Sequence, residues 1–299
     1  MKHSVNIWTK QVSVILALSF TLCAAPLLSA LPSNAPPIKS DKPIKSALRI
    51  ITLSPHLSEI VFALKQQKQL VAVSDYSNYP LPQGCKTAEC KIKLSSVASY
   101  QGADIAQIIR LEPTIILAWE GGNKSQDIAR LEQLGYRVFR SSPENIEELM
   151  AEVLVIGKLI NAVKESHEIR SEMKSQLNQI KRKYIDKKAS ALYYMSLQPL
   201  SGMGSDNWLN SLLELCNITN IYAELPASYA QFSVADILRK QPQVIISASS
   251  QKKEIDEAFW ASHTTVYRAK LVSANPDALH RFTPRALPEV AKLCDKVHY

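Results

Sequence analysis

Two segments of the chain, residues 104–116 and 233–245, repeat one order of local signals: a short helical pattern, a proline and an apolar run. Pro113 and Pro242 end the helical patterns, because proline lacks the amide that a helix interior needs and disfavours helical backbone before it. The apolar runs that follow are typical of buried strands. A chain that builds the same helix–proline–strand unit twice is expected to form two related α/β lobes.

Strand and helix signals alternate in both parts of the chain. Ser54 and Pro55 mark the start of a helix, since Ser favours the cap position and Pro the first turn. Such alternation is typical of Rossmann-like lobes with mostly parallel sheets. We expect strands at 49–53, 70–73, 115–119, 137–139, 191–195 and 244–246, and helices at 55–64, 125–134, 208–216 and from about 287 onward.

Between the lobes, residues 144–186 contain no proline and one glycine, and their apolar residues recur at spacings of three and four. This pattern predicts an amphipathic helix. As a single helix it would be about 60 Å long, with a possible break near His167, and a pair of shorter helices is the alternative. We therefore expect an N-terminal lobe at 48–143, a connecting helix at 144–188 and a C-terminal lobe at 189–299.

The first residues have the signals of an exported protein. Basic residues, a short apolar run and small residues follow one another within residues 1–30, which predicts a cleaved secretory signal peptide. The apolar run is shorter than the ~20 residues of a membrane-spanning helix. Residues 31–47 are rich in Pro and Lys, which is typical of an extended linker. We expect a soluble exported protein.

Four cysteines follow the signal peptide, and an even number in an exported chain indicates disulfides. Cys85 and Cys90 flank a short polar loop and could pair locally, which would leave Cys216 with Cys294; the other two pairings stay open at this point. No histidine lies at a metal-site spacing from Cys85 or Cys90.

The charge pattern argues against nucleic-acid binding. The chain has a formal charge of +8, but six bases and only one acid lie in the first fifty residues, so the remainder carries +3. No basic block interleaved with aromatic residues is present in the sequence.

The sequence lacks the motifs of common hydrolases, such as Gly-x-Ser-x-Gly or His-Glu-x-x-His. An exported hydrolase is therefore a remote alternative, and we expect neither catalysis nor a catalytic cofactor.

His56 lies in the first turn of its helix, where a solvated role is expected. His280, beside Arg281, is the one histidine that we keep as a candidate ligand of a bound metal centre.

Several strings occur in order along the chain: Arg-Ile-Ile-Thr-Leu-Ser-Pro at 49–55, Tyr-Ser-Asn-Tyr-Pro at 76–80, Tyr-Gln-Gly at 100–102, Ala-Trp-Glu-Gly-Gly-Asn at 118–123, Gln-Phe-Ser at 231–233 and Arg-Phe-Thr-Pro-Arg at 281–285. With these strings the chain, from about residue 48 to 297, resembles the cobalamin-binding branch of the class III (helical-backbone) periplasmic solute-binding proteins. The resemblance implies two α/β lobes joined by a single long helix, with cobalamin as the transported ligand bound between them. It also implies a Cys216–Cys294 disulfide, whereas Cys85 and Cys90 lie in an insertion.

The resemblance also implies which residues contact the ligand. Four aromatic residues are expected to line the ligand cleft, and a polar pair four residues apart is expected at its edge to bond the corrin amides. Tyr100 and Tyr229 stand where the family commonly has tryptophan, which keeps a stacking face and makes it smaller. The aromatic set is Tyr79, Tyr100, Trp119 and Tyr229, and the polar pair is Asp277 and Arg281.

The partners implied by the resemblance are an inner-membrane ABC permease and its ATPase subunits, with the binding protein acting as a monomer. In the family, a surface glutamate on each lobe docks to the permease; Ala106 and Ala235 occupy those places here. Asp104 and Asp236 lie nearby, and we predict that they take part in docking. A receptor for haem or a ferric siderophore, in the same fold, is the alternative function.

Overall fold

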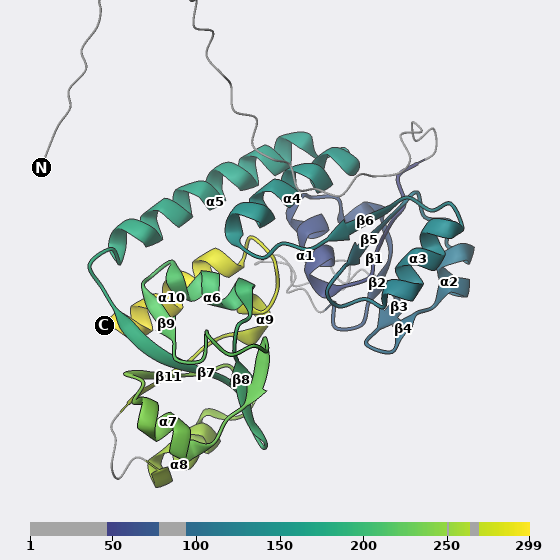
Figure 1. The fold of residues 1–299 in the computed structure, drawn as a ribbon. Helices are drawn as coiled ribbons and strands as arrows, with labels where there is room; N and C mark the ends of the chain where they lie inside the picture. The colour runs from purple at the N-terminus through teal and green to yellow at the C-terminus, as the bar shows by residue number, and fades with distance from the viewer. Residues whose placement is uncertain (1–46, 78–93, 250, 264–268) are drawn as a thin grey trace, which may run out of the picture. The chain divides into compact units, whose positions relative to one another are not determined.

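The computed structural model describes residues 47–77, 94–249, 251–263 and 269–299, all within the compact unit Pro36–Tyr299 (Figure 1). The expected signal peptide lies outside the described residues, as do Tyr79, Cys85 and Cys90. No helix within the described ranges has the length and apolar character needed to cross a bilayer.

The N-terminal lobe contains a six-stranded sheet in the order β4-β3-β2-β1-β5-β6, in which only β3 and β4 pair antiparallel. Its strands are β1 (Ile50–Thr52), β2 (Leu70–Ser74), β3 (Ser95–Ser99), β4 (Gly102–Ala103), β5 (Ile115–Trp119) and β6 (Val138–Ser141). Its helices are α1 (Pro55–Ala63), the 3-10 turn η1 (Gln67–Gln69), α2 (Ile105–Arg110) and α3 (Ser125–Gln133).

The C-terminal lobe repeats this plan with a sheet in the order β10-β8-β7-β11-β12, and β9 pairs in addition with β7. The ladders of β7 with β9 and β11, and of β11 with β12, are parallel, whereas β8 pairs antiparallel with β7 and β10. The strands are β7 (Ala189–Leu197), β8 (Leu200–Met203), β9 (Ile218–Asn220), β10 (Tyr229–Gln231), β11 (Val244–Ser247) and β12 (Lys270–Ser273). The helices are α6 (Asn207–Glu214), α7 (Val234–Lys240), α8 (Lys253–His263), α9 (Pro276–Leu279) and α10 (Ala286–His298). Two lobes of mostly parallel sheets confirm the predicted fold class.

The internal repeat is present in the backbone. In each lobe a short helix, α2 or α7, is followed by the predicted proline and then by a central strand, β5 or β11. The residue before each proline is left-handed, with φ of 44° at Glu112 and 49° at Gln241. A left-handed residue commonly ends a helix, so both copies use the same turn to send the chain into the sheet.

The connection between the lobes corrects the prediction of a single helix and confirms the alternative of two shorter helices. Residues 144–188 do not form one helix but two, α4 (Ile146–Leu159) and α5 (Val163–Lys183), and the break lies at 160–162 rather than near His167. Asn161 has a φ of 58°, a left-handed conformation that Asn adopts more readily than most residues. Lys181 lies 3.2 Å from Glu147, so the end of α5 folds back to the start of α4. The helices form a hairpin, and α5 alone leads to β7.

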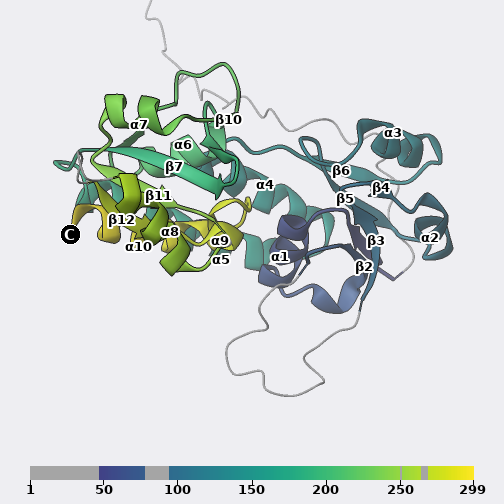
Figure 2. The ribbon, with the colours of Figure 1, turned by 90° about the horizontal axis from the view of Figure 1, so that it is seen from below.

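The apolar core is shared between the lobes. One cluster contains Ile50 and Leu117 of the first sheet, Tyr193 and Ile246 of the second, and the inner faces of α1, α4, α5, α6 and α10. Neighbouring strand residues point the other way, since successive side chains alternate across a strand. Ile51 and Ile116 therefore pack in a separate cluster with residues of α2 and α3, and Ile245 packs in another with residues of α7 and α8. Figure 2 shows α2 and α3 on the side of the N-terminal sheet that lies opposite α1.

A disulfide ties the C-terminal helix to this core. Cys216 and Cys294 are fully buried and bonded, with their Cα atoms 6.0 Å apart. This bond confirms the pairing implied by the family resemblance. The proposed Cys85–Cys90 pair lies outside the described residues.

Candidate ligand-binding site at the junction of the lobes

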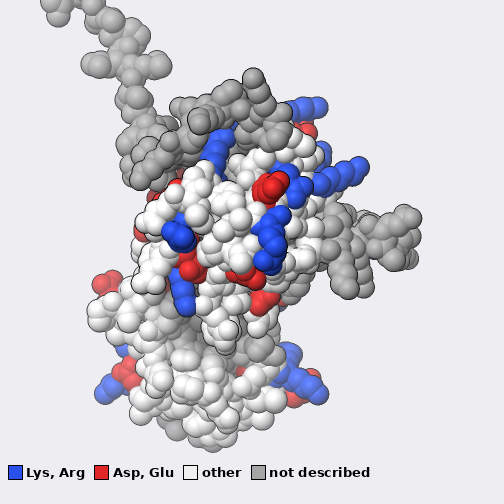
Figure 3. All heavy atoms as spheres, turned by 90° about the vertical axis from the view of Figure 1, so that its right-hand side faces the viewer, with Lys and Arg blue, Asp and Glu red and all other residues white. Residues whose placement is uncertain are grey.

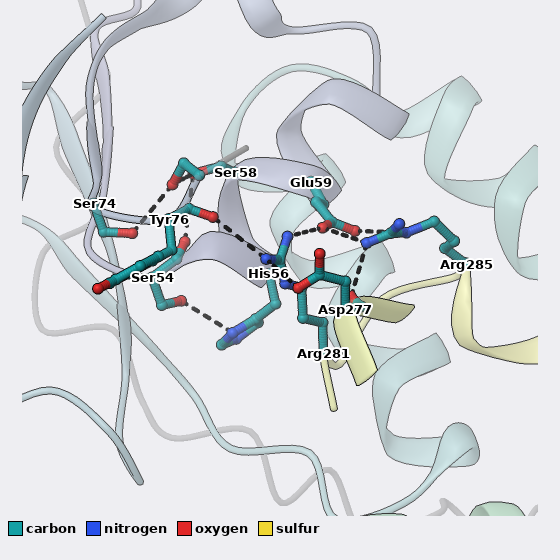
Figure 4. A network of polar contacts seen from close by, with 10 residues as sticks. Ser54, His56, Ser58, Glu59, Ser74, Tyr76, Asp277, Arg281 and Arg285 are labelled. Atoms are coloured by element: carbon teal, nitrogen blue, oxygen red, sulfur yellow. Dashed lines mark hydrogen bonds and ion pairs between the residues drawn. The ribbon is translucent and has the colours of Figure 1, made fainter. Parts of the chain in front are cut away.

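Residues from both lobes meet where β5 and α1 approach the segment between α9 and α10. We call this set the junction site (Figure 4 shows its charged part). It comprises His56, Glu59 and Trp119 of the N-terminal lobe with Asp277, Arg281, Phe282 and Arg285 of the C-terminal lobe.

The Gly-Gly-Asn string after Trp119 has a structural role. A Cβ atom on Gly122 would lie 1.9 Å from the indole Cε3 atom, and one on Gly121 would lie 3.1 Å from the indole Nε1 atom. Asn123 completes the turn, since its side chain accepts a bond from the Trp119 amide and donates one to the Leu53 carbonyl, at 2.7 and 2.8 Å. The indole therefore lies against two bare glycine backbones and is half-buried at the end of β5.

Aromatic rings join the lobes beside this indole. The Phe282 ring lies 5.6 Å from Trp119, 5.2 Å from His56 and 4.9 Å from Trp208, measured between ring centres. Trp208 belongs to the core of the C-terminal lobe, because it is buried and donates its indole N–H to the Leu279 carbonyl at 2.8 Å. Phe282 thus connects the Trp119 indole to the core of the other lobe.

A buried carboxylate joins the lobes through charge. Glu59, with 2% of its side chain exposed, accepts bonds from Arg281 at 2.6 Å and from Arg285 at 2.7 and 3.1 Å. Arg281 also donates to the Asp277 carboxylate at 3.1 Å, and Arg285 donates to the Asp277 carbonyl at 2.8 Å. The predicted polar pair is therefore in contact, and it is part of a larger charged cluster (Figure 4).

His56 contradicts the solvated role expected from its position in the first helical turn. Its ring is 3% exposed, packs edge-on against Trp119 and Phe282, and lies 3.0 Å from the Ser54 hydroxyl through Nδ1. Burial, with a smaller contribution from the charge of Arg281, lowers its pKa from 6.5 to about 3. The neutral ring is thus part of the packing beneath Trp119.

The predicted aromatic residue Tyr229 lies on β10 and is 55% exposed. Its hydroxyl donates to Asp206 at 3.0 Å, and burial together with that carboxylate raises the pKa of the phenol. Nearby, the Tyr193 hydroxyl and His280 Nε2 lie 2.8 Å apart. Burial lowers the pKa of His280 to about 4, so its ring is neutral and already engaged by Tyr193.

The other aromatic candidates are not brought into contact with the junction site by any described bond. Tyr100 follows β3, is 82% exposed, and accepts a bond from the Gln101 side chain at 3.1 Å. Tyr79 lies outside the described residues, but Tyr76 of the same string is exposed, left-handed with a φ of 60°, and has its carbonyl 3.4 Å from Arg281. Residues with a strained backbone often lie at binding sites, so Tyr76 is a candidate site residue that the sequence reasoning did not name.

Glu59, Phe282 and Arg285 were also missed as site residues. Phe282 and Arg285 lie in the quoted string at 281–285, which could have pointed to them. Glu59 carried a weaker signal, a charged residue on the helix between Leu57 and Ile60, both of which are buried.

The aspartates predicted to dock a permease have bonds within the chain. Asp104 caps α2 by accepting a bond from the Gln107 amide at 2.8 Å. Asp236 accepts bonds from Tyr222 at 2.7 Å and Arg239 at 2.6 Å, which lower its pKa. Ala106 and Ala235 are exposed on the same short helices.

The described residues contain no group of three or more His, Cys, Asp or Glu side chains arranged to hold a metal ion. On the face shown in Figure 3, basic and acidic residues are interspersed. That face thus offers no extended basic surface of the kind that binds nucleic acid.

Comparisons with known proteins identify the family of this chain. Residues 50–266 match the model of the periplasmic binding protein family. The vitamin B12-binding protein of Vibrio cholerae is 30% identical over 251 residues, which cover 83% of this chain and 88% of that protein. The counterpart from Yersinia pestis is 29% identical over 258 residues, or 85% and 88% of the two chains.

Solved structures give the same relation. The periplasmic vitamin B12 binding protein BtuF of Vibrio cholerae matches with a TM-score of 0.72 and 29% identity, over 83% of this chain and 96% of that one. The periplasmic heme binding protein HutB of Vibrio cholerae matches with a TM-score of 0.72 and 18% identity, over 85% and 100%, which shows the fold alone. These matches confirm the resemblance drawn from the motifs and the expectation of a binding protein rather than an enzyme. The chain belongs to the periplasmic binding protein family.

Proposed function

We propose that this protein captures cobalamin at the junction site and delivers it to an ABC importer of the inner membrane. The observation that carries the proposal is the Trp119 indole, held half-exposed against Gly121 and Gly122 and in ring contact with Phe282, which directly follows Arg281 of the Asp277–Arg281 pair. A corrin is a broad, partly apolar disc edged with amides. A rigid indole suits the face of such a disc, and a carboxylate–guanidinium pair suits its amide edge, because it offers both acceptors and donors.

The relatives support the ligand, and the sequence supports the location. Both curated relatives described above are named for vitamin B12 binding. We infer that residues 1–30 direct export and are cleaved, and that the mature chain acts in the periplasm as a monomer with cobalamin as its ligand. Tyr79, Tyr100 and Tyr229 are proposed as further ligand contacts.

The test is a titration of the purified mature protein with cyanocobalamin, followed by tryptophan emission and by calorimetry. We expect saturable one-to-one binding and a raised melting temperature, since a ligand that binds only the folded state stabilises it. The visible spectrum of material that co-purifies from the periplasm gives an independent reading. No change on titration, with a Soret shift on adding haem, would contradict cobalamin and favour the haem alternative.

Two candidate axial ligands, Tyr229 and His280, give the haem alternative little support. Haem iron needs an axial ligand such as tyrosinate or a histidine nitrogen. The raised pKa of Tyr229 opposes formation of the phenolate, and the Nε2 atom of His280 is engaged by Tyr193.

We propose further that Asp104 and Asp236 contribute to docking on the permease. Asp104 is exposed and Asp236 partly so, on short helices that are equivalent in the internal repeat. Their intrachain bonds give them a capping and bracing role as well. The double variant Asp104→Asn, Asp236→Asn is expected to bind cobalamin normally and to form less complex with the cognate permease; undiminished complex formation would refute docking through these residues.

A further inference from the structure

We propose that Glu59 is a positioning residue for ligand binding: it holds Arg281, from the other lobe, in the orientation that presents the Arg281–Asp277 pair to the ligand. This inference rests on the proposed function for its consequence, though not for the positioning itself. Glu59 and Arg281 lie 222 residues apart in the sequence, and their side chains meet at 2.6 Å.

The first argument is the rigidity of the carboxylate. Glu59 lies on α1 between Leu57 and Ile60, which are at most 1% exposed, so the helix cannot rotate without exposing its apolar face. Both carboxylate oxygens accept bonds: Oε1 from Arg281 and Arg285, and Oε2 from Arg285. A buried carboxylate with charged donors on both oxygens has little freedom to move.

The second argument is that the two terminal nitrogens of the Arg281 guanidinium have different partners. Its Nη1 atom faces Glu59, and its Nη2 atom faces Asp277 at 3.1 Å and the Tyr76 carbonyl at 3.4 Å. The Arg281 side chain is 12% exposed, whereas the Asp277 side chain is 60% exposed. Glu59 thus fixes the buried edge of the guanidinium, and the opposite edge is left aimed at the exposed carboxylate (Figure 4).

The third argument is the balance of charge. Glu59 and Asp277 together match the two guanidinium charges of Arg281 and Arg285. Without the Glu59 charge, the described bonds would leave Arg281 paired with the mostly exposed carboxylate of Asp277, and Arg285 bonded to the Asp277 carbonyl, which carries no charge. Like charges repel strongly where solvent is excluded, so Arg281 would leave its present position.

The ligand-free protein tests the positioning directly. Nitrogen NMR of arginine side chains, assigned with Arg281→Lys, reports whether rotation of the Arg281 guanidinium is restricted. We expect restricted rotation in the wild type and averaging in Glu59→Gln. Glu172→Gln is the matched control, because Glu172 lines the same cavity of about 340 Å³ beside Glu59 and Arg285 but, among the described residues, accepts its bond from Gln176 and not from an arginine. Restricted rotation that persists in Glu59→Gln would overturn the proposal.

A double-mutant cycle on cyanocobalamin affinity tests the consequence. Glu59→Gln is expected to weaken binding about tenfold, the scale of ordering one flexible side chain, and to cause no further loss in an Arg281→Met background. Equal losses in both backgrounds would mean a general structural role and would refute action through Arg281. Glu59→Asp, which keeps the charge and withdraws it by one methylene, serves if Glu59→Gln does not fold, and it is expected to show the same non-additivity with a smaller loss. If the wild type binds no cobalamin, the proposed function fails, and the NMR measurement still decides the positioning.

Discussion

Trp119 leaves no room for a side chain at Gly122: a Cβ atom there would lie 1.9 Å from the indole Cε3 atom. The contact explains why the indole is followed by two glycines in the sequence. The position of the Trp119 indole, which is the proposed stacking surface, therefore depends on the absence of a side chain at Gly122.

Gly122→Ala is therefore expected to displace the indole and to weaken cobalamin binding by about tenfold or more, because anchor residues must lie in a defined position. Gly135→Ala is the matched control. Gly135 has a φ of 86° and open space around it, so alanine strains the backbone there without touching Trp119. We expect the control to lower stability and to leave affinity unchanged. Equal affinities for the two variants, measured by calorimetry, would contradict this account of the glycine.

Trp119→Ala is expected to reduce cobalamin affinity more than Asp277→Ala does. Removal of a buried aromatic anchor commonly costs about 2 kcal/mol or more, or roughly 30-fold in affinity. Asp277 is mostly exposed, and exposed ion pairs contribute under about 1 kcal/mol. Fluorescence titration of both variants with cobalamin measures which substitution weakens binding more. A larger loss of affinity for Asp277→Ala would show that charged groups, rather than aromatic stacking, dominate recognition.

Stability is expected to fall as the pH is lowered below about 6.5. The pKa of His56 in the folded protein is about 3 against an ordinary 6.5, so the unfolded chain binds more protons between these values. His280, with a pKa of about 4, acts in the same direction. Each adds a slope of up to about 1.4 kcal/mol per pH unit.

Urea unfolding of the wild type and His56→Gln at several pH values between 7 and 4.5 measures this slope. The unfolding free energy of His56→Gln is expected to fall less steeply with falling pH than that of the wild type, because the variant lacks one group that takes up a proton on unfolding. His167→Gln, which changes an exposed histidine of α5, is expected to keep the wild-type slope. An unchanged slope in His56→Gln would contradict the buried neutral ring.

Loss of the Cys216–Cys294 disulfide is expected to cost about 4 kcal/mol of unfolding free energy, because it closes a loop of 78 residues in the unfolded chain. The measurement is urea unfolding of the double variant Cys216→Ala, Cys294→Ala.

We predict a second, local Cys85–Cys90 bond of little importance for stability. Dithiothreitol should therefore destabilise the wild type strongly and the double variant very little, and peptide mapping that finds a crossed pairing would refute the assignment.

The sequence predicted much of the fold because its signals are local. Proline at 113 and 242 ends a helix whatever the rest of the chain does, and the apolar runs of β1, β5, β7 and β11 belong to strands buried on both faces. The strands β3, β4, β8, β9, β10 and β12 were missed, since they carry few apolar residues in succession. The break at Asn161 was misplaced because an amphipathic pattern continues on both sides of a turn that a single Asn permits.

The sequence by itself determined the two α/β lobes and the helix–proline–strand units, and it placed Asp277 and Arg281 four residues apart, where the structure finds them bonded. Only the tertiary structure decided that His56 is buried and neutral, that α4 and α5 form a hairpin, and that Glu59 binds Arg281 and Arg285. Helix caps and strand patterns depend on residues a few positions apart. Desolvation and charge pairing depend instead on which distant segments exclude water from one another, and for Glu59 and Arg281 those segments lie 222 residues apart.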